Sequence, residues 1–406
     1  MPKWLKIGAT VWVVACSVAP PKPTTISNLG LLPTFDRGTM PDRDGNELRS
    51  AALDSYARGD FVRALRFGYW AAQTIPTDVR LRLLLGIVYD GGFDRPDLAL
   101  PEYQRALSLK PDRRFYDRLR RRIHFLSRRL LQDNTRSNIT NKSGNPLSEN
   151  WLAVYPLDHS GLRSPETGLE VALLDWVLPD IRLRSSGLHI DPFTSWIVAQ
   201  VYREMATDPT AEDFARWCGA GTVLTGQLTD LGSGHLRLTL ELLDSSGRKV
   251  YESSALHLDA MDPGSAYTSI IGETSAALGL LASSEAKNQL PIENPVSLSL
   301  YALGLSQYLV GQVSEAESSI QDAITLNPGS DLLGGRHAWA ESDLLGGREG
   351  AELLDDYHRL LNLPDPDRVI RQRLMRGHTM SSPSVNGASG SETEDPYKPP
   401  RTETSQ

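Results

Sequence analysis

One cysteine near the amino terminus stands in a pattern that supports covalent chemistry. Lys3 and Lys6 precede an uncharged apolar run from Ile7 to Ala15, and Cys16 follows directly. Positive charge, a short apolar stretch and a small residue at the cleavage point are the parts of a secretory signal, in order. The apolar run is much shorter than the roughly 20 residues that span a bilayer. We therefore expect a signal peptide over 1–16 and no permanent membrane helix there.

The residues around that cysteine, Val13-Val14-Ala15-Cys16, resemble the bacterial lipobox. The resemblance implies that the Cys16 thiol receives a diacylglycerol and that cleavage exposes an amine, which is often acylated too. Each buried methylene contributes about 0.8 kcal/mol, so two or three acyl chains anchor stably where one would not. Ser17 implies a lipid-anchored outer-membrane protein facing the periplasm, with the inner membrane or the cell surface as alternatives. An ordinary cleavable signal and a cytosolic protein with an apolar amino terminus stay open.

Composition and cysteine content are those of a globular protein. The 406 residues suffice for two or three domains, and 40% are hydrophobic and 23% charged. The formal net charge of -8 gives no reason to expect nucleic-acid binding. Cys16 and Cys218 are the two cysteines, so an acylated Cys16 leaves no internal disulfide. We expect Cys218, in an apolar run, to be a buried, inert thiol.

The sequence offers no pattern of catalytic residues. Its eight histidines are scattered, and no two have the spacing of a metal pair on one helix. It has neither a Gly-x-Ser-x-Gly elbow nor a Walker-type phosphate loop. Asp158-His159-Ser160 are adjacent, whereas catalytic triads are assembled from distant positions, so a capped turn is the better interpretation. We expect a non-catalytic protein without metal or cofactor; a hydrolase would need a carboxylate pair in a cleft.

A repetitive helical section is predicted over 47–134, after a flexible tether over 17–46. Small residues precede two prolines at identical offsets: Ala71 and Ala64 before Pro76, and Ala106 and Ala99 before Pro111. Small side chains let antiparallel helices approach, and proline ends the second helix of each pair. This spacing resembles the tetratricopeptide repeat (TPR), a 34-residue helix-turn-helix unit. One extra residue falls in the predicted turn Asp90-Gly91-Gly92-Phe93.

A strongly basic helix is predicted over 113–131, after the second proline. Its apolar stripe repeats at spacings of 3 and 4 residues, and its other faces are rich in arginine. One interpretation is a capping helix that shows a charged surface to solvent. The other is a site for a polyanion, such as an acidic protein, lipid phosphate, lipopolysaccharide or glycan. The candidate residues for that site are Arg114, Arg118, Arg120, Arg121 and Arg122.

The section over 149–282 has the pattern of a mixed α/β domain. Strands are predicted over 152–157, 222–228, 235–243 and 249–258, with a hairpin turn at Gly232-Ser233-Gly234. Helices are predicted over 169–178, 197–205 and 266–280. This order indicates one layer of mixed sheet covered by helices.

Three short motifs of this section resemble the TolB-like amino-terminal domain, which is related to CsgG-type and FlgO-type lipoproteins. They are LAVYPL (152–157), GAGTVLTG (219–226) and LTLELLD (238–244), the last followed by Gly247 and the strand 250–252. The resemblance implies that these glycines lie at strand entries and turns rather than in an active site. Pore-forming CsgG relatives carry extra amphipathic hairpins, and no pair of alternating segments is available here for a membrane barrel.

Helices are predicted again over 292–376, before a disordered tail over 379–406. One TPR-like unit is in register, through Gly304, Gly311, Ala316, Ile320, Ala323 and Pro328. Ala351, Tyr357, Leu360 and Pro364 suggest a degenerate second unit. The heptapeptide SDLLGGR occurs at 330–336 and again at 342–348, as a 12-residue duplication to which the sequence gives no chemical role.

These patterns predict an α+β fold in which TPR-like helical hairpins flank a central mixed α/β sheet domain. Repeats rarely stack in fewer than three, so we expect them to pack on the sheet domain, on each other or on a second subunit. The first helix of each TPR unit lines a concave groove, so the resemblance implies partner-binding residues. These are Asn46, Arg49, Tyr56, Arg80, Asp90, Tyr301 and Tyr308.

The predicted function is a lipid-anchored, non-catalytic envelope adaptor that binds an envelope protein or peptide through its TPR grooves. Its expected partners are that protein and the membrane, reached through Cys16, with self-association as an option and no nucleic acid. The alternative is a component of an envelope secretion or surface-assembly system, related to CsgG-type lipoproteins.

Overall fold

The computed structural model describes residues 43–162, 168–185, 187–205, 210–259, 261–280, 290–363 and 368–375. The predicted signal peptide with Cys16, nearly all of the predicted tether and the predicted tail lie outside the described residues. Among the helices that the structure describes, none is long and apolar enough to cross a membrane.

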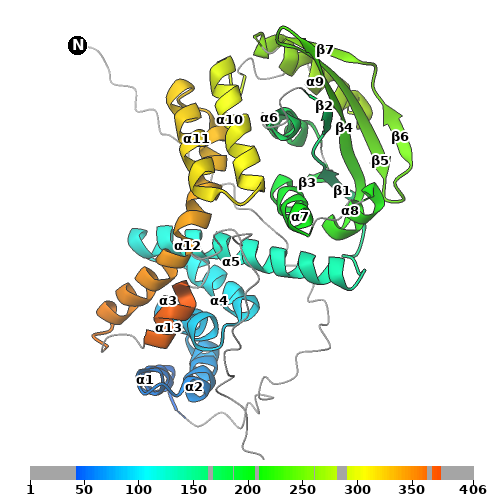
Figure 1. Cartoon of the computed structure of the whole chain (residues 1–406). Helices are drawn as coiled ribbons and strands as arrows, with labels where there is room; N and C mark the ends of the chain where they lie inside the picture. Colours follow the sequence, from blue (N-terminus) through cyan, green and yellow to red (C-terminus); the bar gives the residue numbers. More distant parts are fainter. Residues whose placement is uncertain are drawn as a thin grey trace, which may run out of the picture.

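Five helices form the amino-terminal part of the fold. They are α1 (Gly45–Ala57), α2 (Phe61–Thr74), α3 (Val79–Ile87), α4 (Pro96–Ser108) and α5 (Arg113–Thr140). An aspartate caps the start of each helix but α4, accepting hydrogen bonds from first-turn amides: Asp44, Asp60, Asp78 and Asp112. Local sequence therefore fixes where these helices begin. The last of them, α5, runs past the predicted end of this section and reaches the sheet (Figure 1).

Small residues lie at the contacts between these helices, at the positions predicted from the sequence. Ala64, Ala71, Ala99 and Ala106 are all fully buried. Gly86 lies so close to the Tyr103 ring that a Cβ atom there would overlap it. The residues 88–92, predicted in part as a turn, instead form a buried π-helix, η1 (Val88–Gly92). A π-turn takes up one additional residue within a helix, and Asp90 is a buried member of this one.

The sheet is mixed, as the sequence predicted. Its strands are β1 (Ser148–Val154), β2 (Asp158–Gly161), β3 (His189–Ile190), β4 (Ala220–Gly232), β5 (His235–Asp244), β6 (Lys249–Glu252) and β7 (Leu256–Asp259). The order is β3-β1-β4-β5-β6, with β2 beside β4 and β7 beside β5. Pairs among β1, β2, β3 and β4 are parallel, and β5 is antiparallel to β4, β6 and β7.

The predicted single strand over 249–258 is wrong, because two short strands divide it. The break falls at Ser253, whose amide donates to the Leu240 carbonyl at 2.9 Å. The Ser253 hydroxyl in turn accepts from the Leu240 amide at 2.9 Å, in place of a backbone carbonyl. The strand therefore leaves the regular ladder there and resumes as β7.

Four helices belong to the sheet domain: α6 (Leu169–Arg184), α7 (Pro192–Glu204), α8 (Ala211–Cys218) and α9 (Pro263–Ala277). The main core lies between one face of the sheet and helices α6 and α9 (Figure 1). Helix α8 was not predicted; it has two turns, is capped by Thr210 and ends at Gly219, whose φ is +73°. Cys218, at its end, is buried and free, as expected, and burial raises the pKa of its thiol.

The carboxyl-terminal helices are α10 (Pro295–Leu309), α11 (Val313–Leu326), α12 (Asp331–Leu360) and α13 (Arg368–Met375). The predicted second TPR-like unit is wrong. Such a unit has two helices joined by a turn, whereas a single 30-residue helix, α12, extends over nearly all of the residues assigned to it. The first half of α12 lies beside α11, and its second half lies against α5 and α13 (Figure 1). This helix therefore joins the sheet half of the molecule to the amino-terminal helices.

Candidate functional site

The groove predicted for the amino-terminal helices is filled by the chain's own carboxyl-terminal helices. Tyr357, on α12, is fully buried and donates from its hydroxyl to the carbonyl oxygen of Arg80 on α3 at 3.0 Å. His358 shares a hydrogen bond of 2.8 Å with the hydroxyl of Tyr56 on α1. Arg373, on α13, donates to the carbonyl of Gly92 in η1. Residues about 300 positions apart therefore meet in this groove.

Two of the predicted groove residues are buried inside the fold. Tyr56 is 4% exposed and Asp90 is 2% exposed. Asp90 accepts two hydrogen bonds from Arg122, at 2.9 and 2.8 Å, and one from the Tyr103 hydroxyl at 3.2 Å. The prediction that Tyr56 and Asp90 line an open groove is therefore wrong, because α12 covers Tyr56 and the Asp90 carboxylate is buried against Arg122 and Tyr103.

The two tyrosines predicted for the carboxyl-terminal groove are buried too. Tyr301 is fully buried and donates to Asp175 on α6, and Tyr308 donates to Asp343 on α12. Burial raises the pKa of both phenols well above the usual value. Their assignment to a groove is wrong, because they face the elements on which α10 packs.

Asn46, Arg49 and Arg80 remain at the surface, where the groove is still open. Arg49 contacts Asp78 at 2.6 Å, and Asn46 and Arg80 are exposed. Beside them is a small cavity of about 100 Å³ between α1, α3 and the end of α12. Its lining is Arg49, Ser50, Leu53, Arg80, Leu81, Leu84, Tyr357 and Leu361. Sequence reasoning could not find Tyr357 and Leu361, because they come from the far end of the chain.

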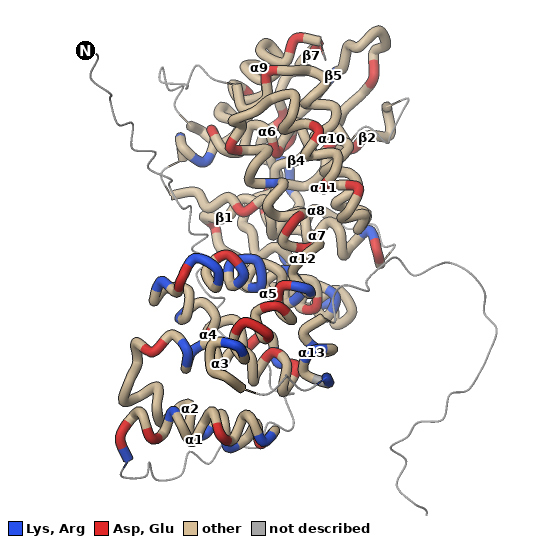
Figure 2. The backbone as a smooth tube through the Cα atoms, turned by 90° about the vertical axis from the view of Figure 1, so that its left-hand side faces the viewer, with Lys and Arg blue, Asp and Glu red and all other residues tan. Residues whose placement is uncertain are grey.

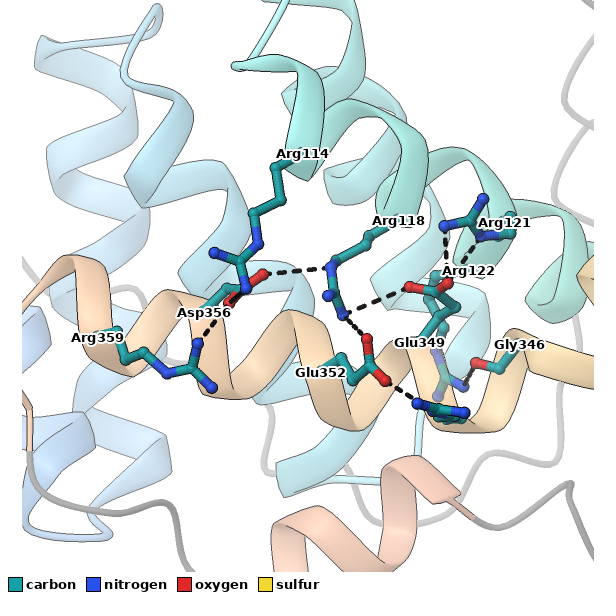
Figure 3. A network of polar contacts seen from close by, with 10 residues as sticks. Arg114, Arg118, Arg121, Arg122, Gly346, Glu349, Glu352, Asp356 and Arg359 are labelled. Atoms are coloured by element: carbon teal, nitrogen blue, oxygen red, sulfur yellow. Dashed lines mark hydrogen bonds and ion pairs between the residues drawn. The ribbon is translucent and has the colours of Figure 1, made fainter.

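The basic helix α5 faces a row of three carboxylates on α12, Glu349, Glu352 and Asp356, which we call the acidic row. Arg118 contacts all three: it pairs with Glu352, lies 3.5 Å from Glu349 and lies 3.2 Å from Asp356 (Figure 3). Burial opposes ionisation of Glu352, yet hydrogen bonds from Arg348 and Arg118 hold the pKa of its carboxyl below the usual value. Glu352 is therefore charged where it meets α5.

Two further arginines of α5 complete this contact. Arg114 lies 2.6 Å from Asp356, and Arg121 lies 2.7 Å from Glu349. Together with Arg118 they form what we call the arginine row. Figure 2 shows basic residues gathered along α5 in the middle of the molecule, with acidic segments beside them.

The remaining two candidates for a polyanion site differ from one another. Arg120 is exposed, whereas Arg122 is fully buried. Burial opposes the charge of Arg122, but Asp90 raises the pKa of its guanidinium. The structure thus corrects both interpretations of the basic helix. Four of its five candidate arginines meet carboxylates of this same chain, and Arg120 alone of the five is exposed without an ion pair among the described residues.

A second buried cluster holds the first half of α12 to the sheet domain. Asp175, on α6, is fully buried and accepts from Arg336 at 2.8 and 2.7 Å. The Trp196 indole donates to the same carboxylate at 3.1 Å, as does the Tyr301 hydroxyl. The Arg336 guanidinium also lies 3.8 Å from the centre of the Trp339 ring. Because the Asp175 carboxylate accepts this many hydrogen bonds, its role is structural, and it is not available as a general base.

The duplicated heptapeptide lies on α12, and its two copies have different roles. Twelve residues make about three and a third helical turns, so the second copy is rotated by about 120° from the first. In the first copy Arg336 is buried against Asp175, and Gly334 has open space around it. In the second copy Asp343 pairs with Arg128, and Gly346 lies under the Phe125 ring. The rotation explains why identical residues meet different neighbours.

No metal site emerges from the described part of the chain: there, no three His, Cys, Asp or Glu side chains are grouped so that they could hold an ion. No protein-family model matches the sequence, and no curated protein matches it.

Proposed function

We propose that this chain is a lipid-anchored, non-catalytic adaptor of the bacterial envelope, which holds a partner protein in the groove of its amino-terminal helices. The observation that carries the proposal is the open end of that groove. There Arg80 and Arg49, the latter paired with Asp78, line a cavity together with three leucines of the amino-terminal helices and Leu361. A cavity of this kind suits a protein segment that presents an apolar side chain next to a carboxylate.

The buried polar groups support a binding role over a catalytic one. Asp90 and Asp175, the carboxylates at the centres of the two buried clusters, each accept two hydrogen bonds from one arginine and another from a tyrosine. A general base needs a free lone pair within reach of a substrate proton. These groups join elements instead of facing a cavity.

The support for the lipid anchor and for the family resemblance comes from the sequence. The lipobox ending at Cys16 supports acylation, and the spacing of small residues and prolines supports TPR-like units on both sides of a TolB-like domain. Feeding labelled palmitate to producing cells tests the anchor. Label should appear in the wild type and be lost in Cys16→Ala; retained label in the variant would refute acylation at that thiol.

Site-specific photocrosslinking in producing cells tests the groove. A photoreactive amino acid replaces Ser50, which lines the cavity and is exposed, and in a matched chain it replaces Thr268, which is exposed on α9. A partner held in the groove should give a discrete crosslinked species from position 50 and none from position 268. The same species from both positions, or none from position 50, would contradict the proposal.

A further inference from the structure

One arginine of α5, Arg122, donates hydrogen bonds both to a carboxylate and to backbone carbonyls of two other helices. Nε and Nη2 of Arg122 donate to Asp90, whereas Nη1 donates to the carbonyl oxygens of Gly346, at 2.9 Å, and Leu374, at 3.0 Å. Asp90 belongs to η1, so the negative charge that compensates the Arg122 guanidinium comes from the amino-terminal helices. The position of this guanidinium, which binds the backbone of α12, therefore does not depend on α12.

Glycines allow α12 to approach that arginine. A Cβ atom on Gly346 would overlap the Phe125 side chain, and one on Gly350 would lie 2.8 Å from Cζ of Arg122. Both neighbours come from α5, and both are buried. A helix can reach Nη1 of Arg122 only if it carries glycine, four residues apart, at these two positions.

The acidic row stands beside the glycines at fixed spacing. Counted from Gly346, Glu349 is three residues later, Glu352 six and Asp356 ten. These carboxylates meet the arginine row, whose members are partly exposed: Arg114 is 58% exposed and Arg121 is 27% exposed. Charge complementarity with these arginines selects acidic helices for this surface.

The helix that occupies this surface is intrinsically weak. Residues 334–350 of α12 contain five glycines, and each costs up to about 1 kcal/mol of helix stability relative to alanine. A Cβ atom on Gly334 or Gly335 would have nothing within 4 Å, so packing does not require those two glycines. Arg122 is thus held by Asp90 without help from α12, whereas α12 depends on this surface to stay helical.

We propose that the segment of α12 from Gly346 to Asp356 is a built-in occupant, which a partner helix of the same chemistry replaces. That helix carries glycine at positions i and i+4 and carboxylates at i+3, i+6 and i+10. It binds Arg122, Phe125 and the arginine row. The inference goes beyond the proposed function, since this surface of α5 shares no residue with the lining of the cavity beside Arg49 and Arg80, and it names the class of helix that would replace α12 there.

A labelled synthetic peptide of residues 341–363 serves as the probe, with fluorescence anisotropy against the whole chain from residue 17 onward. Gly350→Leu in the chain expels its own segment, because the side chain collides with Arg122. Gly334→Leu is the matched control: the same change on the same helix, in open space. We expect the peptide to bind Gly350→Leu at least tenfold more tightly than it binds the wild type or Gly334→Leu.

The second half of the test uses peptides with altered sequences. A peptide with its own Gly350→Leu change, or with the acidic row replaced by the corresponding amides, should lose at least tenfold in affinity. Equal affinity of the native peptide for all three chains, or of all peptides for Gly350→Leu, would overturn the proposal.

A second variant guards against misfolding of Gly350→Leu. Glu349→Arg with Asp356→Arg repels the arginine row yet keeps both glycines, and circular dichroism checks its fold. It too should gain peptide binding, and a folded variant without that gain would overturn the proposal.

The adaptor function and the displacement of α12 can be refuted separately. Peptide binding without a crosslink from position 50 would refute the adaptor function, whereas a crosslink without peptide binding would refute displacement alone.

Discussion

Arg122 and Asp90 form a buried ion pair with two hydrogen bonds, of 2.9 and 2.8 Å, between α5 and η1. Their side chains are 0% and 2% exposed. The pair stands where the amino-terminal helices, α12 and α13 meet, since Nη1 of Arg122 also binds Gly346 and Leu374. Neither residue can lose its partner without leaving a charge in the core.

Asp90→Asn should therefore destabilise the protein strongly. It leaves the Arg122 guanidinium buried without a compensating charge, which costs about 3–5 kcal/mol of unfolding free energy. Urea unfolding measures this loss. Asp94→Asn is the control: Asp94 pairs with Arg129 at 3.2 Å and is 35% exposed, so its loss should stay under about 1 kcal/mol. Similar losses for the two variants would mean that the buried pair contributes no more than a surface pair.

The two copies of the duplicated heptapeptide should respond in opposite ways to alanine. Gly334→Ala, in open space, should stabilise the protein by about 0.5–1 kcal/mol, because alanine favours the helix. Gly346→Ala should destabilise it, because overpacking against Phe125 costs roughly 1–3 kcal/mol. Thermal melts of both variants provide the measurement. A gain in melting temperature for Gly346→Ala would show that α12 does not pack closely on α5.

Glu352, in the acidic row, should make stability depend on pH on the acid side. Hydrogen bonds from Arg348 and Arg118 outweigh burial and lower the pKa of Glu352 in the folded state. Its contribution is therefore present above the unfolded pKa and is lost as pH falls through the folded pKa. Glu352→Gln should be less stable than the wild type at pH 6, and the difference should close as pH approaches 3. Urea unfolding of both proteins at the two pH values provides the measurement, and a difference that persists at pH 3 would contradict this role for Glu352.

His124 should give a second pH dependence, nearer to neutrality. Burial lowers the pKa of this imidazole, which packs on Phe193 and has Asp343, Arg128 and Arg120 as charged neighbours. Because the folded pKa is depressed, the neutral form stabilises the fold, and that stability falls as pH drops below the unfolded value of about 6.5.

His124→Phe removes this titration and keeps an aromatic ring in the same place. Unfolding free energies at pH 7.5, 6.5 and 5.5 should fall for the wild type, by at most about 1.4 kcal/mol for each pH unit from one proton, and stay level for the variant. An equal fall in both proteins would assign the pH dependence to another group.

Local signals in the sequence determined much of the secondary structure. The hairpin at Gly232-Ser233-Gly234 was predicted correctly, because the two glycines adopt the positive φ that the turn requires. The mixed sheet was predicted from alternating apolar residues, and the contacts between α3 and α4 from the positions of small residues. The break at Ser253 was not, since it depends on a hydroxyl bonding to the neighbouring strand.

Only the tertiary structure decided what the charged and aromatic side chains do. The sequence shows that Arg118 and Arg122 lie on a basic helix, but not that Glu352 and Gly346, over 200 residues later, lie against them. Periodicity gives the face of a helix on which a residue lies, whereas the partner of that face depends on how distant elements pack. For this reason the sequence predicted an open groove with Tyr56 in its lining, and the fold fills it with α12.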